Sequence, residues 1–157
     1  MEKYALIGHP LGHSMSPLIH ESLFALSGKN DVSYELVDIA PEKLSASEEL
    51  IKSFNGLNVT IPHKQSVIPF MSELGASAER YHSVNCIQNQ NGKLTGYNTD
   101  CDGFLMSAEK LPIGENVAVL GCGGVGRMIA IETALHGGKL TLAVIPQDVK
   151  NAQILMA

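Results

Sequence analysis

The sequence contains no tryptophan, few other aromatic residues and no dense cluster of lysine or arginine. Its formal net charge is -5, which argues against a nucleic-acid-binding surface. The three cysteines, Cys86, Cys101 and Cys122, are odd in number and show no C-x-x-C spacing, so neither a disulfide framework nor a cysteine metal site is expected. We therefore expect a small-molecule ligand, no nucleic acid, and a reduced cytoplasmic environment.

Long apolar runs are also missing, as is the pattern of a signal peptide, so no membrane association is expected. Hydrophobic residues make up 45% of the 157 positions, enough to bury a sizeable core in one domain, or in one domain and part of another. A soluble globule, monomeric or homodimeric, is the expectation. No metal is expected either, because Pro10 and Gly12 disrupt any helical i, i+4 pairing of the nearby histidines.

Short apolar runs alternate with helical patterns in the first half of the chain. Strands are predicted at 4–8, 32–39 and 57–61. Helices are predicted from Ser16-Pro17 to Leu26 and from Pro41 to Phe54, the latter with Leu44, Leu50 and Ile51 inward. A short helix is predicted at 64–71, interrupted near Pro69. This rhythm is typical of an α/β protein. It predicts a mixed, mostly parallel sheet with helices on both faces.

The middle of the chain carries a hairpin signal. Segments 84–88 and 93–97 flank Asn91-Gly92, a helix is predicted at 75–80 before them, and Thr99-Asp100 can cap the helix after them. Pro112 and Gly114 then mark a linker. We predict a substrate-binding and catalytic domain at 1–113 and a partial second domain at 114–157.

A glycine-rich segment follows the predicted strand at 116–120. Glycines here allow a close backbone approach to a pyrophosphate, and the following helix directs its N-terminus at it, so we predict cofactor binding by Gly121, Gly123, Gly124, Val125 and Gly126. A tight turn without a ligand is the alternative. A second strand at 140–145 and a helix within 146–157 complete the pattern, giving an incomplete Rossmann-type dinucleotide-binding domain.

The segment 58–64 places polar groups at the carboxyl end of a strand, where α/β proteins bind ligands. Lys64, held by the carboxylate of Asp100, would be a suitable proton donor; a helix-start lysine and a helix cap are the alternatives. Ser14 and Ser16 stand at a helix N-terminus, which favours an anion such as a carboxylate; simple capping, with Ser16 as the N-cap, is the alternative.

Three segments, 8–17, 58–64 and 96–103, together resemble shikimate dehydrogenases. By this resemblance Ser14 and Ser16 hold the substrate carboxylate, Lys64 and Asp100 are the catalytic pair, and two further residues approach the substrate hydroxyls, namely Thr60 and Asn85. The resemblance implies NADP-dependent, reversible reduction of 3-dehydroshikimate to shikimate, a step of the shikimate pathway that leads to chorismate and the aromatic amino acids. Quinate is the neighbouring substrate.

The chain departs from the family pattern at some positions. Cys86 stands where Gly-Ala-Val-Asn-Thr would have threonine, and His82-Ser83 replaces Gly-Ala. Segment 144–148 lacks the arginine that meets the 2′-phosphate of NADP, although Lys150 could replace it and Asp148 would favour NAD. NADP is therefore implied by the resemblance alone, with NAD as the alternative.

Family members continue for roughly another hundred residues, which complete the nucleotide-binding sheet. We accordingly expect a truncated enzyme. A non-catalytic shikimate- or quinate-binding module without a complete cofactor site is the second interpretation. A methylene-tetrahydrofolate dehydrogenase is a third, against which the paired serines and Asn98-Thr99-Asp100 count.

Overall fold

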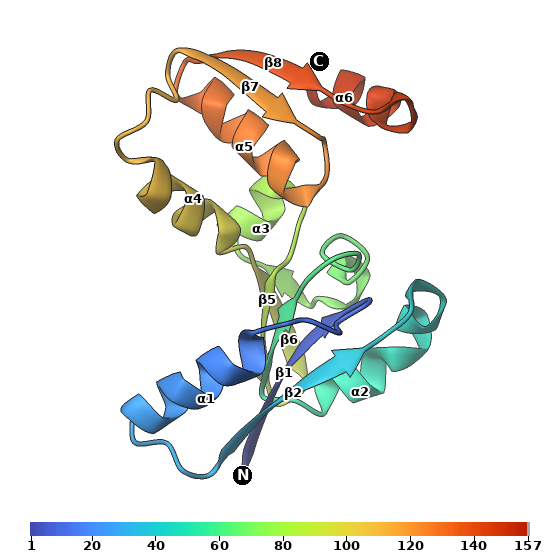
Figure 1. Ribbon diagram of the computed structural model, residues 1–157. Coiled ribbons are helices and arrows are strands. Elements are labelled where there is room, and N and C mark those ends of the chain that lie inside the picture. The colour runs from blue at the N-terminus through green and yellow to red at the C-terminus, as the bar shows by residue number, and fades with distance from the viewer. Residues whose placement is uncertain (157) are drawn as a thin grey trace. The chain divides into compact units, whose positions relative to one another are not determined.

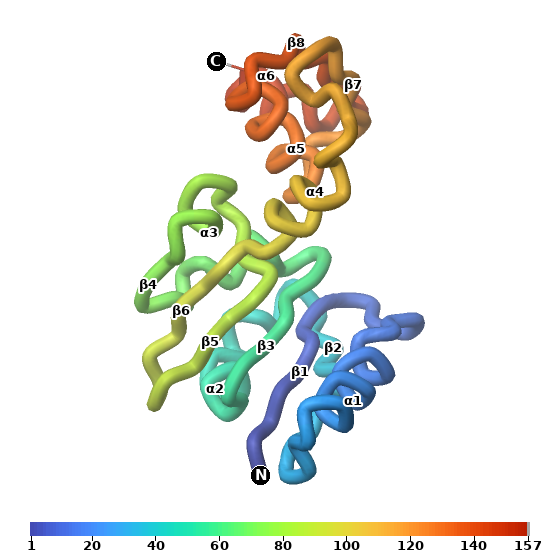
Figure 2. Tube along the Cα trace, turned by 90° about the vertical axis from the view of Figure 1, so that its left-hand side faces the viewer, coloured from blue at the N-terminus to red at the C-terminus, as the bar shows by residue number. Residues whose placement is uncertain are grey.

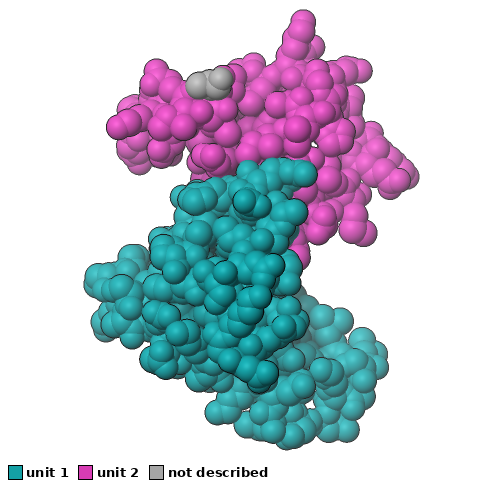
Figure 3. Space-filling view, turned by 180° about the vertical axis from the view of Figure 1, so that it is seen from behind, with its two compact units in different colours: residues 1–98 teal, residues 99–157 magenta. Residues whose placement is uncertain are grey.

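A computed structural model describes residues 1–156. The chain divides into two compact units, unit 1 from Met1 to Asn98 and unit 2 from Thr99 onward, which are coloured separately in Figure 3. The predicted domain boundary near residue 113 stays a prediction. In the structure, the helix that follows Thr99 is grouped with unit 2.

Unit 1 is built on one six-stranded sheet with the strand order β2-β1-β3-β5-β6-β4. β1 pairs in parallel with β2 and β3, β4 pairs in parallel with β6, and β5 is antiparallel to β3 and β6. Figure 2 shows β1, β3, β5 and β6 side by side. The elements are β1 (Glu2–Gly8), α1 (Ser16–Leu26), β2 (Val32–Asp38), η1 (Pro41–Ser47), α2 (Glu48–Lys52), β3 (Gly56–Val59), η2 (Ile68–Phe70), β4 (Glu73–Leu74), α3 (Ala76–Tyr81), β5 (Cys86–Gln90) and β6 (Lys93–Tyr97). The predicted mixed, mostly parallel sheet is confirmed.

The alternation of side chains along the strands separates two faces of this sheet. Ile7 of β1 and Val59 of β3 belong to the main core, which also contains Ile51 of α2 and Ala78 of α3. The opposite face carries α1, and α1 and α2 lie on opposite sides of the sheet in Figure 1. The prediction of helices on both faces is therefore confirmed.

The helix predicted from Pro41 to Phe54 is a 3-10 helix followed by a short α-helix. Leu44 and Ile51 are buried as predicted, but Leu50 is 44% exposed. A 3-10 helix turns every three residues rather than every 3.6, so an apolar stripe drawn for one continuous α-helix does not stay on one side. The prediction that Leu50 faces the core is wrong.

The helix predicted at 64–71 is also wrong, because the chain forms turns there and then η2. In an α-helix the Lys64 carbonyl would accept the amide of Ile68, but it accepts the amide of Val84 instead, at 2.7 Å. Pro69 further limits any helix that could begin here. His63 is buried, with its Nε2 2.6 Å from the Ile39 carbonyl oxygen. A tertiary contact and a proline thus override the local helical pattern.

Unit 2 contains the predicted order of strand, glycine-rich segment, helix and strand. β7 and β8 pair in parallel, and the intervening α5 contacts both strands. Within residues 1–156, no helix combines the length and the apolar character needed to cross a membrane. The elements are α4 (Asp100–Ala108), β7 (Asn116–Leu120), α5 (Gly124–Leu135), β8 (Lys139–Ala143), η3 (Pro146–Asp148) and α6 (Val149–Met156).

Candidate functional site

The carboxyl ends of β1 and β3 bring two distant segments of the chain together. The strands run in parallel and end at Gly8 and Val59. Beyond these ends the Thr60 amide donates to the Ile7 carbonyl, and the His9 amide donates to the Ile61 carbonyl, both at 2.9 Å. The loop after β1 and the segment after β3 therefore leave the sheet as neighbours.

Three of the predicted substrate-binding residues line one cavity at this edge. The cavity has a volume of about 440 Å³ and is lined by Leu6, Pro10, Leu11, Gly12, His13, Ser14, Ser16 and Thr60. Ser14, Ser16 and Thr60 are each partly buried, so their hydroxyls lie at a surface that is recessed but open to solvent. The structure thus unites residues that are 44 positions apart in the sequence.

The two serines are held at the beginning of α1. The Ser14 hydroxyl accepts the Ser16 amide and donates to the Ser16 hydroxyl, both at 3.2 Å. The N-cap position is Met15 and α1 begins at Ser16, so the prediction that Ser16 caps the helix is wrong. No acidic residue stands in the first turn of α1, which leaves the positive end of the helix dipole facing this loop.

Asp38, at the end of β2, anchors the loop that carries these serines. Its carboxylate lies 2.6 Å from the His9 Nδ1 and accepts the Leu11 amide at 3.0 Å. These two hydrogen bonds, His9 first, hold the pKa of Asp38 below its ordinary value. Neither His9 nor Asp38 was predicted to support the site. The parallel register pairs Gly8 with Asp38 and so places His9, the next residue, beside the Asp38 carboxylate. This register is set by the folded sheet and is not carried by a local sequence pattern.

Lys64 and Asn85 lie at the same edge of unit 1. The Asn85 carbonyl accepts the amide of Val59, the last residue of β3, at 2.8 Å, and the Asn85 amide donates to the Tyr97 carbonyl at 2.9 Å. Lys64 is held next to this segment by the bond from the Val84 amide to its carbonyl. Both side chains are partly buried. Backbone pairing therefore delivers Lys64 and Asn85 to the end of the strand that leads to Thr60.

Asp100 belongs to unit 2. It is the first residue of α4 and is partly buried, while Thr99 holds the N-cap position without a side-chain capping hydrogen bond. The predicted pairing of Asp100 with Lys64 stays a prediction.

The glycine-rich segment of unit 2 requires glycine at two positions, one for its backbone conformation and one for lack of space. Gly121 has a φ of +96°, and a Cβ on Gly126 would collide with the Gly121 carbonyl oxygen. Gly123 is the N-cap of α5, and a Cβ there would meet nothing within 4 Å, so the space before the helix is open. An open backbone cradle at a helix N-terminus fits the diphosphate of a dinucleotide. The Gly121, Gly123, Gly124, Val125 and Gly126 assignments are all located at this turn.

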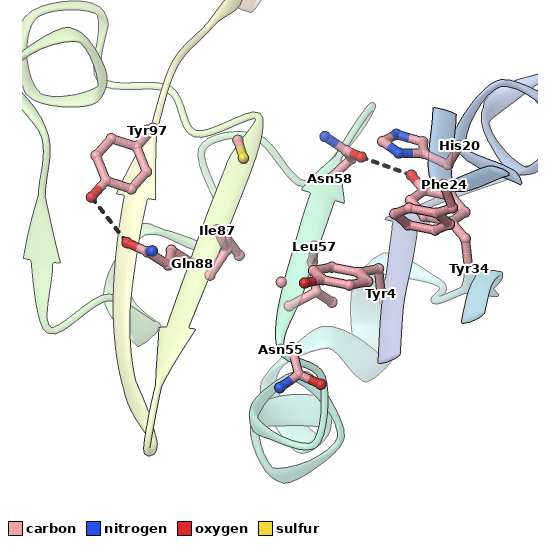
Figure 4. Close-up of a pocket in the computed structure, with 12 residues that line it drawn as sticks. Tyr4, His20, Phe24, Tyr34, Asn55, Leu57, Asn58, Ile87, Gln88 and Tyr97 are labelled. Carbon is pink, nitrogen blue, oxygen red and sulfur yellow. Dashed lines mark hydrogen bonds between the residues drawn. The ribbon is translucent and has the colours of Figure 1, made fainter. Parts of the chain in front are cut away.

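A second cavity, of about 540 Å³, lies on the α1 face of the unit 1 sheet and is drawn in Figure 4. Its walls are largely aromatic and aliphatic, and Cys86 lines it as a thiol whose pKa is raised by burial. Tyr34 and His20 stack in this cavity with ring centroids 4.1 Å apart. Both residues were missed by the sequence reasoning, although the alternation of the strand at 32–39 indicates an inward tyrosine.

Histidines in unit 1 make contacts other than metal coordination. His9 pairs with Asp38, His63 bonds the Ile39 carbonyl, and His20 stacks on Tyr34. Among residues 1–156, no group of three or more His, Cys, Asp or Glu side chains is arranged to hold a metal ion.

Comparison with known proteins identifies the family and the fold. Residues 6–87, more than half of the chain, match the family model of the shikimate dehydrogenase substrate binding domain. The chain belongs to the shikimate dehydrogenase family. The matched range contains the serine loop, Thr60, Lys64 and Asn85, while Asp100 and the glycine-rich turn lie beyond it.

Similar proteins extend beyond the chain. A shikimate dehydrogenase (NADP(+)) of Moorella thermoacetica is 43% identical over 145 residues, which cover 88% of this chain and 49% of the relative. The corresponding protein of Symbiobacterium thermophilum is 36% identical over 157 residues, covering 97% of this chain and 53% of the relative. The chain thus spans about half the length of these curated relatives of the shikimate dehydrogenase family.

Solved structures of the family superpose closely on the chain. Shikimate dehydrogenase from Aquifex aeolicus is 34% identical with a TM-score of 0.87, covering 98% of this chain and 60% of that one. The enzyme from Thermus thermophilus, in complex with NADP(H) and shikimate, is 30% identical with a TM-score of 0.85, covering 99% of this chain and 59% of that one. The α/β fold predicted from the sequence is confirmed.

Proposed function

We propose that the chain carries the substrate site and the beginning of the cofactor site of an enzyme that reversibly reduces 3-dehydroshikimate to shikimate with NADPH. The observation that carries this proposal is the single cavity that gathers Ser14, Ser16 and Thr60 at the ends of two parallel strands. The names of the relatives, and a similar structure in complex with NADP(H) and shikimate, support an enzyme over a non-catalytic binding module.

The serine loop would bind the substrate carboxylate. Ser14 and Ser16 present adjacent hydroxyls at the positive end of α1, and this end has no acidic side chain of its own in the first turn. A carboxylate placed there gains charge-assisted hydrogen bonds and a favourable interaction with the helix dipole. Thr60 and Asn85 would hydrogen-bond the ring hydroxyls, because fixed polar partners best select a compact polyol.

Lys64 and Asp100 would carry out the proton transfer. Reduction adds a hydride to the carbonyl carbon, and the carbonyl oxygen must receive a proton as its negative charge develops. The Lys64 ammonium would donate that proton, and the Asp100 carboxylate would hold the ammonium in place. In the reverse direction neutral Lys64 would take the proton from the shikimate hydroxyl.

The glycine-rich turn, Gly121 to Gly126, would hold the pyrophosphate of the nicotinamide cofactor, which supplies the hydride when bound. NADP is proposed from the names of the relatives. The segment after β8 has no arginine, so Lys150 of α6 is the candidate for the 2′-phosphate, and NAD is the alternative. The enzyme would act in the cytoplasm as a monomer or a homodimer.

Two measurements test this function. Calorimetric titration of the 157-residue chain should show binding of shikimate. In a form of the protein with a complete cofactor domain, the absorbance of reduced cofactor should rise when shikimate and NADP⁺ are added together. Quinate and NAD⁺ are the matched comparisons for substrate and cofactor preference. Binding without turnover would favour the binding module. Absence of both binding and turnover would contradict the proposal.

A further inference from the structure

Tyr34 connects the two elements that carry the substrate site. It lies on β2, an edge strand, and is buried, with 8% of the residue exposed. The Tyr34 hydroxyl donates to the Asn58 Oδ1 on β3 at 2.8 Å, as Figure 4 shows. Because β1 lies between β2 and β3, the tyrosine side chain spans a whole strand to make this bond. Asn58 precedes Thr60 by two residues, so the bond is made close to the substrate cavity.

The tyrosine is also attached to the serine loop. His20, one turn after Ser16 on α1, stacks on the Tyr34 ring with an interplanar angle of 8°. Leu11, which precedes the serines in the loop, is buried in a small cluster with Leu6 and Tyr34. Burial raises the pKa of Tyr34 to about 12. The hydroxyl therefore remains a protonated donor at neutral pH.

We infer that Tyr34 is a positioning residue for the substrate site, which sets the serine end of α1 and the end of β3 at a fixed separation: its ring packs against His20 and Leu11, and its hydroxyl bonds Asn58. The inference rests on the proposed function, since the spacing matters only if one ligand contacts both the serine loop and Thr60. Tyr34 itself does not line the 440 Å³ cavity, so it acts through Asn58, His20 and Leu11 rather than by touching the substrate.

The test removes only the hydroxyl, with Tyr34→Phe, which keeps the ring that packs against His20 and Leu11. Tyr4→Phe is the matched control, because Tyr4 lines the same larger cavity but its hydroxyl donates to Glu2, at 3.0 Å. Shikimate dissociation constants are measured by calorimetry and unfolding midpoints by thermal denaturation. Asn58→Ala and the Tyr34→Phe/Asn58→Ala double variant complete a cycle that isolates the coupling between the two side chains.

Tyr34→Phe should raise the shikimate dissociation constant roughly tenfold, as for the loss of one hydrogen bond, while Tyr4→Phe stays within about twofold of wild type. In the Asn58→Ala background the same Tyr34 change should alter the constant by less than about twofold, because the acceptor is already gone. A purely structural role for Tyr34 would instead weaken binding equally in both backgrounds, and that result would overturn the inference.

If Tyr34→Phe binds shikimate as tightly as the wild-type chain does, the inference about Tyr34 is overturned. The proposed function would still stand in that case, because the wild-type chain binds shikimate. If the wild-type chain binds no shikimate, the proposed function fails and this inference fails with it. The unfolding midpoints show whether a loss of affinity reflects a loss of fold: Tyr34→Phe should stay folded, with a midpoint lowered by about 2–4 °C.

Discussion

The hydroxyls of Ser14 and Ser16 already bond each other, and this arrangement leaves them side by side at the mouth of a cavity. Replacing either serine with alanine should weaken shikimate binding by about 1.5–3 kcal/mol, the range for a charge-assisted hydrogen bond. Ser22→Ala is the control, because Ser22 is on the same helix but bonds the Leu18 carbonyl, on the exposed side. Unchanged affinity in both Ser14→Ala and Ser16→Ala would reduce the serines to a structural role.

Lys64 is proposed to act in chemistry rather than in binding. Lys64→Ala should lower kcat by at least about 100-fold, the contribution of a positioned general acid, and leave shikimate affinity within about tenfold. Steady-state kinetics on a catalytically active form of the protein, paired with calorimetry, separate the two effects. Lys43→Ala, an exposed lysine on η1, should leave both values unchanged. Near-normal kcat in Lys64→Ala would remove this residue from the mechanism.

Asp38 makes the serine loop sensitive to acid. Its pKa is lowered in the folded protein by His9 and the Leu11 amide, so its contribution to stability is present above the ordinary carboxyl pKa. That contribution is lost as the pH falls through the lowered, folded-state pKa. The difference in unfolding midpoint between wild type and Asp38→Asn should therefore shrink with acidification. Glu35→Gln, on the same strand and exposed, should show no such trend. A difference that is constant with pH would contradict the argument.

At the scale of elements, the turn between β7 and α5 depends on glycine. A Cβ on Gly126 would collide with the Gly121 carbonyl, so Gly126→Ala must displace either the turn or the first residues of α5. We expect a lower unfolding midpoint and loss of dinucleotide binding, measured by thermal denaturation and by titration with NADP⁺. If Gly126→Ala binds the cofactor as wild type does, the turn is not the pyrophosphate site.

Gly103→Ala is the matched control for that change. Gly103 is exposed within α4, and an added Cβ would meet nothing within 4 Å. Alanine is favoured over glycine inside a helix by roughly 0.5–1 kcal/mol, so the midpoint should rise or stay the same. The two substitutions are chemically identical, and only the surroundings of the glycine differ.

For individual elements, the sequence predicted the structure well where neighbouring residues determine the backbone conformation. Asn91 and Gly92 both adopt positive φ in the hairpin that their pairing predicted, and β7 spans the predicted residues 116–120. Prediction from the sequence failed where a residue distant in the chain determines the backbone conformation. The Lys64 carbonyl bonds Val84 rather than the next helical turn, and no local pattern carries that information.

In the candidate site, too, residues in local motifs were predicted, and a residue whose contact depends on the tertiary fold was not. Ser14, Ser16 and Thr60 were predicted because the family motifs contain them, and the structure gathers them in one cavity. Tyr34 was not predicted, because its contact with Asn58 depends on the strand order β2-β1-β3, which only the folded sheet reveals.

For the whole molecule, shikimate and NADP⁺ should each protect a different unit from hydrogen exchange. Shikimate should slow hydrogen exchange in the serine loop and around Thr60, in unit 1, while NADP⁺ should slow it at the beginning of α5, in unit 2. Exchange measured by mass spectrometry on peptides from each unit tests this directly. The hairpin tip at Asn91-Gly92 is an internal reference, because it follows the end of β5 opposite to the end at Asn85. Protection by shikimate confined to unit 2 would contradict the assignment of its site.

The proposed substrate-binding residues Ser14, Ser16 and Thr60 lie beyond the last paired residues of β1 and β3, while those last residues, Ile7 and Val59, are buried in the core. The residues proposed to recognise the ligand therefore lie in the segments after the strands, and the residues that form the core lie within the strands. A protein built this way can change which acid it accepts by altering a few loop positions, with little risk of losing its structure. That separation makes the serine loop the natural place to begin when redirecting this scaffold to a new substrate.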